Sequence, residues 1–350
     1  MGYKKKGNKL FANGLKLGIN RIYGGFSDDH GWLKDVKALL QTTINGQLML
    51  LMLIESLHLE GIETYYANTD GITVICPKDK KEVLNKIWKE WDAKLNMALE
   101  EVEFKKSYIR DVNNFINVKL DGEVKLKGAY EYTGYLEKYG EFDLTGSFSN
   151  PVVPYAVVLY FTEGIPVEDT LRGHIKKYPK DGIYDFCTAK KSSKQFDNIL
   201  FTMNKSKVKV EKLQQSVRYY VSNSTQRLYK VKDKTERELL SLVKNSKHMT
   251  NSYIFSHDNL PQYKRIGYVE SYGYVYLVEQ KVIINNPKKE WLHYDEVEAG
   301  WNITLFNNYF QSDDYNIDYN YYIYEANKLI DAIEKSGVSK NINDTQLKLF

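Results

Sequence analysis

The sequence contains little cysteine and no long apolar run. Two of its 350 residues are cysteines, Cys76 and Cys187, so a disulfide framework is excluded. The six histidines are scattered without zinc-site spacing, so a bound metal would need carboxylate ligands. The longest apolar run, residues 48–54, is far shorter than the roughly 20 residues of a membrane span. The N-terminus also lacks the apolar core of a signal peptide. The sequence therefore predicts a cytoplasmic protein without a membrane segment.

The sequence contains enough apolar residues for a buried core, and its charge is unevenly distributed. Hydrophobic residues make up 43% of a chain long enough for two or three domains. The net charge is +4, but residues 172–250 carry 19 Lys and Arg against 7 Asp and Glu, a local charge of +12. Such a block is either a solvated surface or the surface that meets a nucleic-acid backbone.

Residue periodicity predicts an α+β fold. A basic helix should end near Gly24, and a long helix over residues 32–59 shows one broad apolar face that should pack on a sheet. A third helix should start near Pro77 and run to about 101, and strands should follow at 102–110, 115–120 and 124–130. Later segments predict a helix within 151–170, strands at 274–278 and 281–284, and a last helix over 319–334. The first half therefore predicts an antiparallel sheet backed by two helices.

A β-hairpin is expected between the second and third of these helices. Residues 66–71 read Tyr-Ala-Asn-Thr-Asp-Gly and lie between two segments rich in β-branched and aromatic residues. Asp70 would then lie at the hairpin tip. An Asp-Gly pair of this kind is a common turn signal and needs no functional reason by itself.

Three patterns, taken in order, resemble motifs of the family B DNA polymerases, especially those of phages. Residues 16–24, Lys-Leu-Gly-Ile-Asn-Arg-Ile-Tyr-Gly, resemble the fingers helix called motif B. Residues 66–71 resemble motif C, Tyr-any-Asp-Thr-Asp-Ser, and residues 105–108 resemble the Lys-Lys-any-Tyr element. The order and spacing carry the resemblance, which covers about residues 10–335. The sequence departs from the family pattern at Arg21, Asn68 and Gly71, where Ser, Asp and Ser are usual.

The resemblance implies a division of the chain into four parts. Residues 1–31 would be the remnant of the fingers helix, and residues 32–150 a palm with an antiparallel sheet and a metal-binding hairpin. Residues 151–335 would form the palm–thumb junction and a mixed thumb that binds duplex DNA. Residues 336–350 would be a flexible tail.

The resemblance also implies DNA-templated DNA synthesis by Mg²⁺-dependent nucleotidyl transfer. Asp70 would be a catalytic residue and would ligate one or both of two magnesium ions. The residues that would bind the incoming deoxynucleoside triphosphate and the nascent base pair are Lys16, Asn20, Tyr23 and Gly24. The residues that would bind the primer-template duplex are Lys105, Lys106, Tyr108, Lys125 and Lys127.

The family's other metal-binding carboxylate, in motif A, and its exonuclease domain lie upstream of motif B and are not in this sequence. Asp28 and Asp29 are possible substitutes, but their place in a loop favours a role in capping the next helix. We therefore expect the isolated chain to be inactive until an N-terminal polymerase half completes it, in a phage-infected bacterial cell. A non-catalytic duplex-DNA-binding remnant of a polymerase is the alternative. A reverse transcriptase fits less well, because its hairpin usually carries paired aspartates.

The C-terminus carries one more pattern. Residues 346–350, Gln-Leu-Lys-Leu-Phe, resemble the peptide with which bacterial replication proteins bind the sliding clamp. Gln346 would be held by hydrogen bonds, while Leu347, Leu349 and Phe350 would fill an apolar pocket of the clamp. A frayed amphipathic terminus is the simpler alternative.

Overall fold

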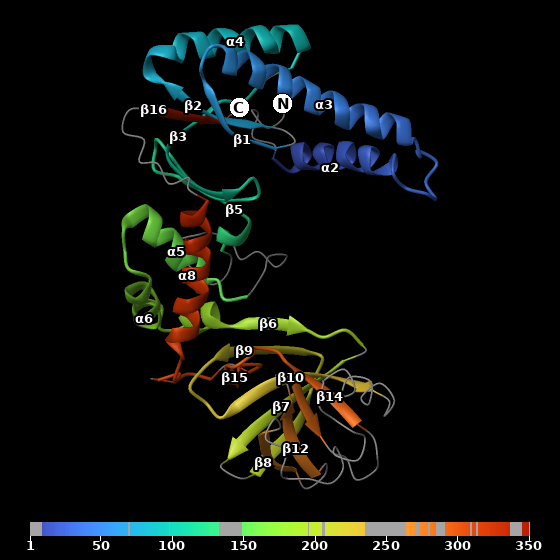
Figure 1. The fold of residues 1–350 in the computed structure, drawn as a ribbon, viewed down its shortest axis with the longest axis vertical. Coiled ribbons are helices and arrows are strands. Elements are labelled where there is room, and N and C mark those ends of the chain that lie inside the picture. Colours follow the sequence, from blue (N-terminus) through green and yellow to red (C-terminus); the bar gives the residue numbers. More distant parts are fainter. Residues whose placement is uncertain are drawn as a thin grey trace. The chain divides into compact units, whose positions relative to one another are not determined.

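The computed structural model shows an α+β protein whose chain folds into two compact units (Figure 1). Unit 1 comprises Met1–Leu126 and Ser336–Phe350, and unit 2 comprises Lys127–Lys335. The structure describes residues 9–68, 71–97, 99–132, 149–194, 196–204, 207–234, 264–269, 273–278, 281–284, 291–308, 310–312, 314–336 and 345–349.

Unit 1 is built on a six-stranded sheet with the strand order β1-β2-β16-β3-β4-β5. The pairs β1–β2, β2–β16, β16–β3 and β3–β4 are antiparallel, as the sequence pattern predicts for this half. The helices of the unit are α2 (Lys9–Gly25), α3 (Val36–Leu59) and α4 (Lys81–Leu95). The strands are β1 (Glu63–Ala67), β2 (Ile72–Pro77), β3 (Val102–Asp111), β4 (Asn114–Lys119), β5 (Val124–Lys127) and β16 (Thr345–Leu349).

Helices α3 and α4 cover one face of this sheet and form its core (Figure 1). Trp91 on α4 is 7% exposed, and its indole N–H donates to the backbone oxygen of Met49 on α3 at 2.8 Å. Leu53 and Leu57 on α3 are buried against β2 and α4. The apolar side chains at helical spacing thus meet the sheet, which is the arrangement expected from the sequence.

The prediction that the broad apolar face of the long helix packs on the sheet is wrong for one side of that face. Val36, Leu40, Ile44, Leu48 and Leu51 recur at helical spacing on one side of α3, and each is about half exposed. At 100° per residue, this stripe lies on the side of α3 roughly opposite Leu53 and Leu57, which are buried in the core. The first turns of α3 also extend past the sheet (Figure 1).

Length and composition alone would allow α3 to cross a membrane. This is a weak criterion, since core helices also meet it. The buried residues Leu53 and Leu57 make the C-terminal half of α3 part of the core of unit 1.

Unit 2 combines a helical cluster, a three-stranded sheet and a closed barrel. Helix α5 (Val152–Glu163), whose residues 152–159 are buried, packs against α6 (Val167–Lys177) and α8 (Tyr319–Lys335). The three-stranded sheet has the order β15-β9-β6, and the barrel the order β10-β14-β13-β12-β11-β8-β7. The sheet strands are β6 (Thr188–Lys191), β9 (Ser216–Val221) and β15 (Ile303–Leu305). The barrel strands are β7 (Asp197–Asn204), β8 (Lys207–Leu213), β10 (Gln226–Lys234), β11 (Lys264–Val269), β12 (Gly273–Val278), β13 (Lys281–Ile284) and β14 (Trp291–Glu296).

Buried polar side chains join the helices of unit 2 to β9 and to the segment Gly182–Phe186. The Tyr322 hydroxyl on α8 donates to the backbone oxygen of Phe186 at 2.9 Å and accepts from the N–H of Val221 on β9 at 2.8 Å. His174 on α6 is hydrogen-bonded through Nε2 to Asp185 at 2.8 Å, and both side chains are 1% exposed. These bonds satisfy the Tyr322 hydroxyl and one ring nitrogen of His174, which would otherwise be costly to bury.

The prediction of a flexible tail is wrong for Thr345–Leu349, which form β16 inside the sheet of unit 1. This segment pairs with β2 on one side and β3 on the other. A short alternating apolar and polar segment can pair as a strand wherever two strand edges are open, and sequence pattern alone does not show such a gap. Residues 337–344 and Phe350 lie outside the described residues.

Candidate active site and nucleic-acid interface

The hairpin formed by β1 and β2 carries the predicted metal-binding motif. The N–H of Asn68 donates to the backbone oxygen of Gly71 at 2.9 Å, which closes the turn between the two strands. Thr69 and Asp70, between them in the chain, lie outside the described residues, so the metal role of Asp70 stays a prediction. Among the described residues there is no group of three or more His, Cys, Asp and Glu side chains that could hold a metal ion.

The start of β2 fixes the base of the hairpin. Gly71, Ile72, Thr73 and Val74 are all buried, and Ile72 and Val74 belong to the core formed with α3 and α4. The hydroxyl of Thr73 has no hydrogen-bond partner in the part of the chain that the structure describes. Burying a hydroxyl without a hydrogen-bond partner costs free energy.

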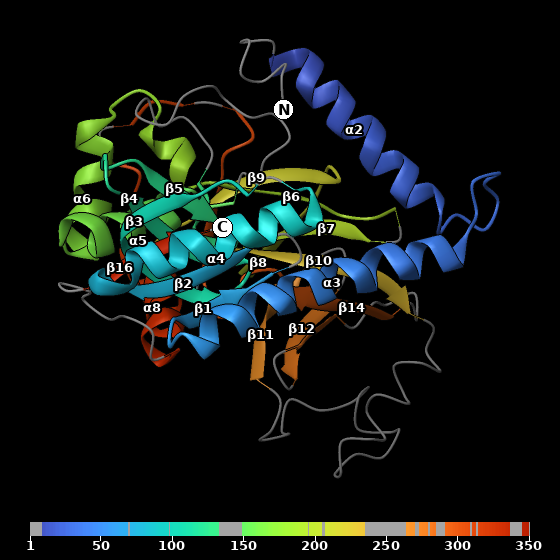
Figure 2. The same ribbon diagram turned by 90° about the horizontal axis from the view of Figure 1, so that it is seen from above.

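Helix α2 presents the predicted nucleotide-binding residues. Lys16 and Asn20, four residues apart, lie on one face of the helix and are exposed. Tyr23 is 40% exposed, and its hydroxyl is hydrogen-bonded to the Thr43 hydroxyl on α3 at 2.7 Å. The two helices leave the loop at residues 26–35 and diverge from it (Figure 2). Lys16 and Asn20 are thus open to a ligand, while Tyr23 also holds α2 to α3.

Gly24 is the last predicted residue of this helix and lies in open space. A Cβ added at Gly24 would meet no atom within 4 Å, and the same holds for Gly14 on α2. Both positions are helical, and alanine is the better helix former by about 1 kcal/mol. The structure of the chain itself therefore gives no reason for glycine at either position.

Gly24→Ala is expected to leave thermal stability unchanged or slightly raised. If Gly24 lies beneath a nascent base pair, as the resemblance implies, the variant should lower nucleotide incorporation by about tenfold or more. Incorporation would be measured as single-turnover primer extension by the chain combined with the N-terminal polymerase half that the resemblance implies. Gly14→Ala is the matched control and should have no effect on incorporation. If the Gly24→Ala and Gly14→Ala variants were equally active, Gly24 would not be part of the nucleotide-binding site.

The aspartates considered as substitute metal ligands have structural partners. Asp28 accepts a hydrogen bond from the N–H of His30 at 3.0 Å, and Asp29 pairs with Lys34 at 2.8 Å. The N-cap of α3 is Asp35, which accepts from the N–H of Ala38 at 2.9 Å. The capping role expected of Asp28 or Asp29 thus belongs to Asp35.

Strand β3 carries the predicted DNA-binding lysines at a β-bulge. The register with β4 shifts between Phe104 and Lys106, so Lys105 is the extra residue of the bulge and is exposed, while Lys106 is half-buried. A bulge changes side-chain direction locally, which a regular strand with strict alternation does not allow. Tyr108 on the same strand is half-buried, and its burial raises the pKa of its phenol.

The turn that follows β3 is tightly bonded. Asp111 accepts hydrogen bonds from the Asn114 side chain at 2.8 Å and from the N–H of Asn113 at 2.9 Å, and it pairs with Arg110 at 2.8 Å. The bond from Asn114 is the largest of the causes that lower the pKa of Asp111 to about 2. Lys125, on β5, and Lys127 are exposed.

The basic block of residues 172–250 is partly neutralised within unit 2. Lys190 pairs with Glu298 at 2.8 Å, Arg227 with Glu296 at 3.0 Å and Lys212 with Asp197 at 2.7 Å. Glu298 and Glu296 lie outside the block, so a regional charge count does not reveal the first two pairs, whereas Asp197 is already part of that count. Part of the +12 charge therefore serves internal pairing.

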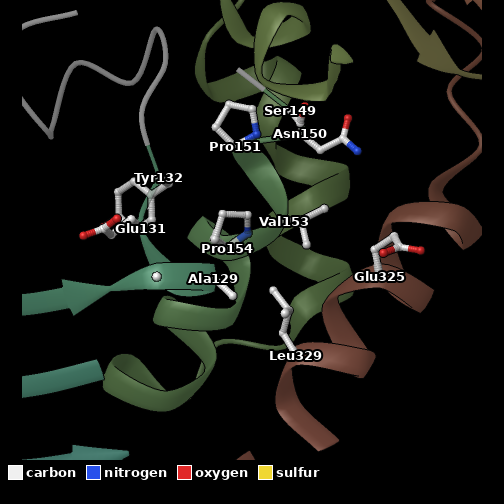
Figure 3. Close-up of a pocket in the computed structure, with 11 residues that line it drawn as sticks. Ala129, Glu131, Tyr132, Ser149, Asn150, Pro151, Val153, Pro154, Glu325 and Leu329 are labelled. Atoms are coloured by element: carbon white, nitrogen blue, oxygen red, sulfur yellow. The ribbon is translucent and has the colours of Figure 1, made fainter. Parts of the chain in front are cut away.

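A separate pocket of about 330 Å³ lies in unit 2, where Gly128–Tyr130, the start of α5 and α8 meet (Figure 3). Its lining residues are Gly128, Ala129, Glu131, Tyr132, Ser149, Asn150, Pro151, Val153, Pro154, Glu325 and Leu329. The carboxylates of Glu131 and Glu325 point away from each other (Figure 3), so they do not form a shared metal site. The sequence patterns did not indicate this pocket.

Taken together, the fold defines an α+β protein with a helix-backed antiparallel sheet in one unit and a barrel in the other. No protein-family model, no curated protein and no solved structure matches the chain. The assignment of a function therefore depends on the motifs and on the elements that carry them.

Proposed function

We propose that the chain is the C-terminal palm and thumb part of a family B DNA polymerase and carries out DNA-templated nucleotidyl transfer when an N-terminal part completes it. One observation carries the proposal. The three motifs lie in unit 1 on three kinds of element that suit their roles: an exposed helix face, a closed hairpin turn, and a strand with an exposed lysine at a bulge.

The chemistry fits these elements. Two magnesium ions about 3.5–4 Å apart would activate the primer 3′-hydroxyl and stabilise the leaving pyrophosphate, and Asp70 would supply one carboxylate. Lys16 and Asn20 would meet the triphosphate as a charge and a hydrogen-bond donor. A second carboxylate is needed because two divalent ions repel each other strongly without enough negative ligand charge. That carboxylate would come from a segment outside this sequence.

Primer extension tests the proposal. The chain alone, with Mg²⁺, a primer-template duplex and all four deoxynucleotides, should give no product, whereas coexpression with the polypeptide that carries motif A should give template-dependent synthesis. No synthesis by the reconstituted pair, combined with tight duplex binding, would favour the non-catalytic alternative.

The lysines of β3 give a separate prediction about DNA. The variant Lys105→Ala/Lys106→Ala should bind a primer-template duplex about tenfold or more weakly. The slope of the logarithm of its affinity against the logarithm of the salt concentration should become shallower by about one for each phosphate contact that is lost. Both quantities follow from polarisation titrations at several salt concentrations. Lys94→Ala, which removes an exposed charge from α4, is the control. An equal loss of affinity in the control would mean that the lysines of β3 contribute only to the net charge of the chain and do not contact the DNA.

A further inference from the structure

Helix α3 carries a stripe of apolar side chains that remains about half exposed. We call it the α3 stripe, and its members, at i, i+4 and i+3 spacing, are Val36, Leu40, Ile44, Leu48 and Leu51. It begins at the first residue of α3, where the helix extends past the sheet, and it lies roughly opposite the buried residues Leu53 and Leu57 (Figure 1). The core of unit 1 therefore does not account for these apolar side chains.

The surface of α3 around the stripe carries no charge. Between Lys37 and Glu55 the sequence contains no Lys, Arg, Asp, Glu or His, and among these residues only Leu53 is buried. The surface of a soluble domain usually has a charged residue at about one position in four. An exposed, uncharged and apolar surface of this length is typical of an interface with another macromolecule.

Helix α2 adds a second apolar face beside the first. Its members lie at i, i+4 and i+7, are 47–66% exposed, and are Leu15, Ile19 and Ile22. Tyr23, the next residue on α2, is hydrogen-bonded to Thr43, which directly precedes Ile44 of the α3 stripe. The two helices leave one loop and diverge from it (Figure 2), so both present apolar side chains near this bond.

We propose that the α3 stripe, flanked by the apolar face of α2, is the interface of a homodimer in which a second copy of the chain packs the same stripe against it. An interface with twofold symmetry places a surface against itself, so that surface must be self-complementary. The uncharged α3 stripe meets this condition because no like charges face each other. Side chains at i, i+4 spacing also form a ridge that packs between the same ridges of another helix, at a crossing angle of about 50°.

The apolar area of α2 and α3 suits a dimer that dissociates on dilution. A fully exposed Val, Leu or Ile side chain presents about 60–120 Å² of apolar area, so the half-exposed residues of both helices offer roughly 500–1,000 Å² over two copies. Because interfaces are about 60% apolar, the whole contact would bury roughly 800–1,600 Å². Specific interfaces begin at about 1,000 Å², so the expected dimer is a small one.

Sedimentation velocity of the full chain tests the dimer over concentrations of about 1–100 µM. The unmodified chain should change from monomer to dimer as its concentration rises. Ile44 lies at the middle of the α3 stripe, so the twofold axis should pass near it. Ile44→Lys should raise the dissociation constant about 100-fold or more, because symmetry brings two ammonium groups into one apolar contact.

Leu17→Lys is the matched control. Leu17 is 57% exposed, against 50% for Ile44, and it lies on the side of α2 opposite Leu15 and Ile19. This variant should form the dimer as the unmodified chain does. An unmodified chain that is monomeric at every concentration would overturn the proposal, and so would equal dissociation constants for the two lysine variants.

Cross-linking gives a second test that does not depend on how the lysine variants fold. Cys76 and Cys187 are both buried, so the thiol of Ile44→Cys is the accessible one. Mild oxidation of this variant should give a disulfide-linked dimer on a non-reducing gel, because the same residue of the second copy lies across the axis. Leu17→Cys should give little or none. Equal cross-linking of the two cysteine variants would contradict the proposed interface.

A lipid bilayer is the competing occupant of this surface, because α3 has the length and composition of a membrane span. Flotation with vesicles of phosphatidylcholine and phosphatidylglycerol separates the two. The homodimer predicts that the chain stays in the soluble fraction. If the unmodified chain floats with the vesicles and Ile44→Lys does not, the α3 stripe binds lipid and the homodimer is wrong. None of these experiments uses DNA, nucleotide or metal, so their outcome is independent of the proposed function.

Discussion

Asp70→Asn is expected to abolish DNA synthesis by the completed enzyme, with a loss of about 10³-fold or more. The amide has no negative charge and is a poorer ligand for Mg²⁺, so several kcal/mol of transition-state stabilisation should disappear. The loss should appear in single-turnover primer extension at saturating duplex and nucleotide. Duplex affinity should change little, because the lysines of β3 remain.

Asn68→Ala is the matched control for damage to the hairpin. The bond that closes the turn comes from the backbone N–H of Asn68, so the alanine variant keeps it. This variant should retain synthesis within about tenfold of the unmodified chain. If Asp70→Asn were equally active, the metal ligand would lie elsewhere and the duplex-binding alternative would be favoured.

Trp91→Ala is expected to destabilise unit 1 by about 3–5 kcal/mol, the usual cost of removing a large buried aromatic side chain. Trp91 is 7% exposed, and it joins α4 to α3 through its bond to the Met49 carbonyl. The change would leave a cavity and an acceptor without its donor. Chemical denaturation followed by circular dichroism should show that the part of the signal from unit 1 is lost at a lower denaturant concentration.

Trp88→Ala, on the same helix, separates this effect from the loss of any tryptophan. Trp88 is half-buried, and its indole N–H donates to Asn85 within α4 rather than to α3. Its replacement should cost clearly less than that of Trp91. Equal losses for the two variants would mean that the bond to Met49 adds nothing to the stability of unit 1.

Local sequence signals predicted several elements of both units well. Helix α2 of unit 1 ends at Gly25, next to the expected Gly24, and β3 of unit 1 and β12, β13 and α8 of unit 2 lie where the residue pattern predicts them. These elements follow from periodicity and from stop signals such as glycine pairs, which act between neighbours in the chain. The same signals identified the hairpin and the order of its neighbouring motifs.

Such local signals do not predict contacts between residues that are far apart in the sequence. The half-exposed stripe on α3 lies on the side away from Leu53 and Leu57, and helix periodicity does not show which side of a broad apolar face the sheet will cover. The pairing of Arg227 with Glu296 in unit 2 likewise depends on strand neighbours far apart in the sequence. The bulge at Lys105 depends on the register with β4.

The sequence by itself determined the α+β class and the hairpin, since these follow from residue type, spacing and order, and it supplied the candidate residues. The tertiary structure decided where the C-terminal residues lie. Gln346–Phe350 contain a short alternating segment that suits either a free peptide or a strand, and local propensity does not separate the two. The choice depends on the open edges of β2 and β3, which exist only once the sheet has formed.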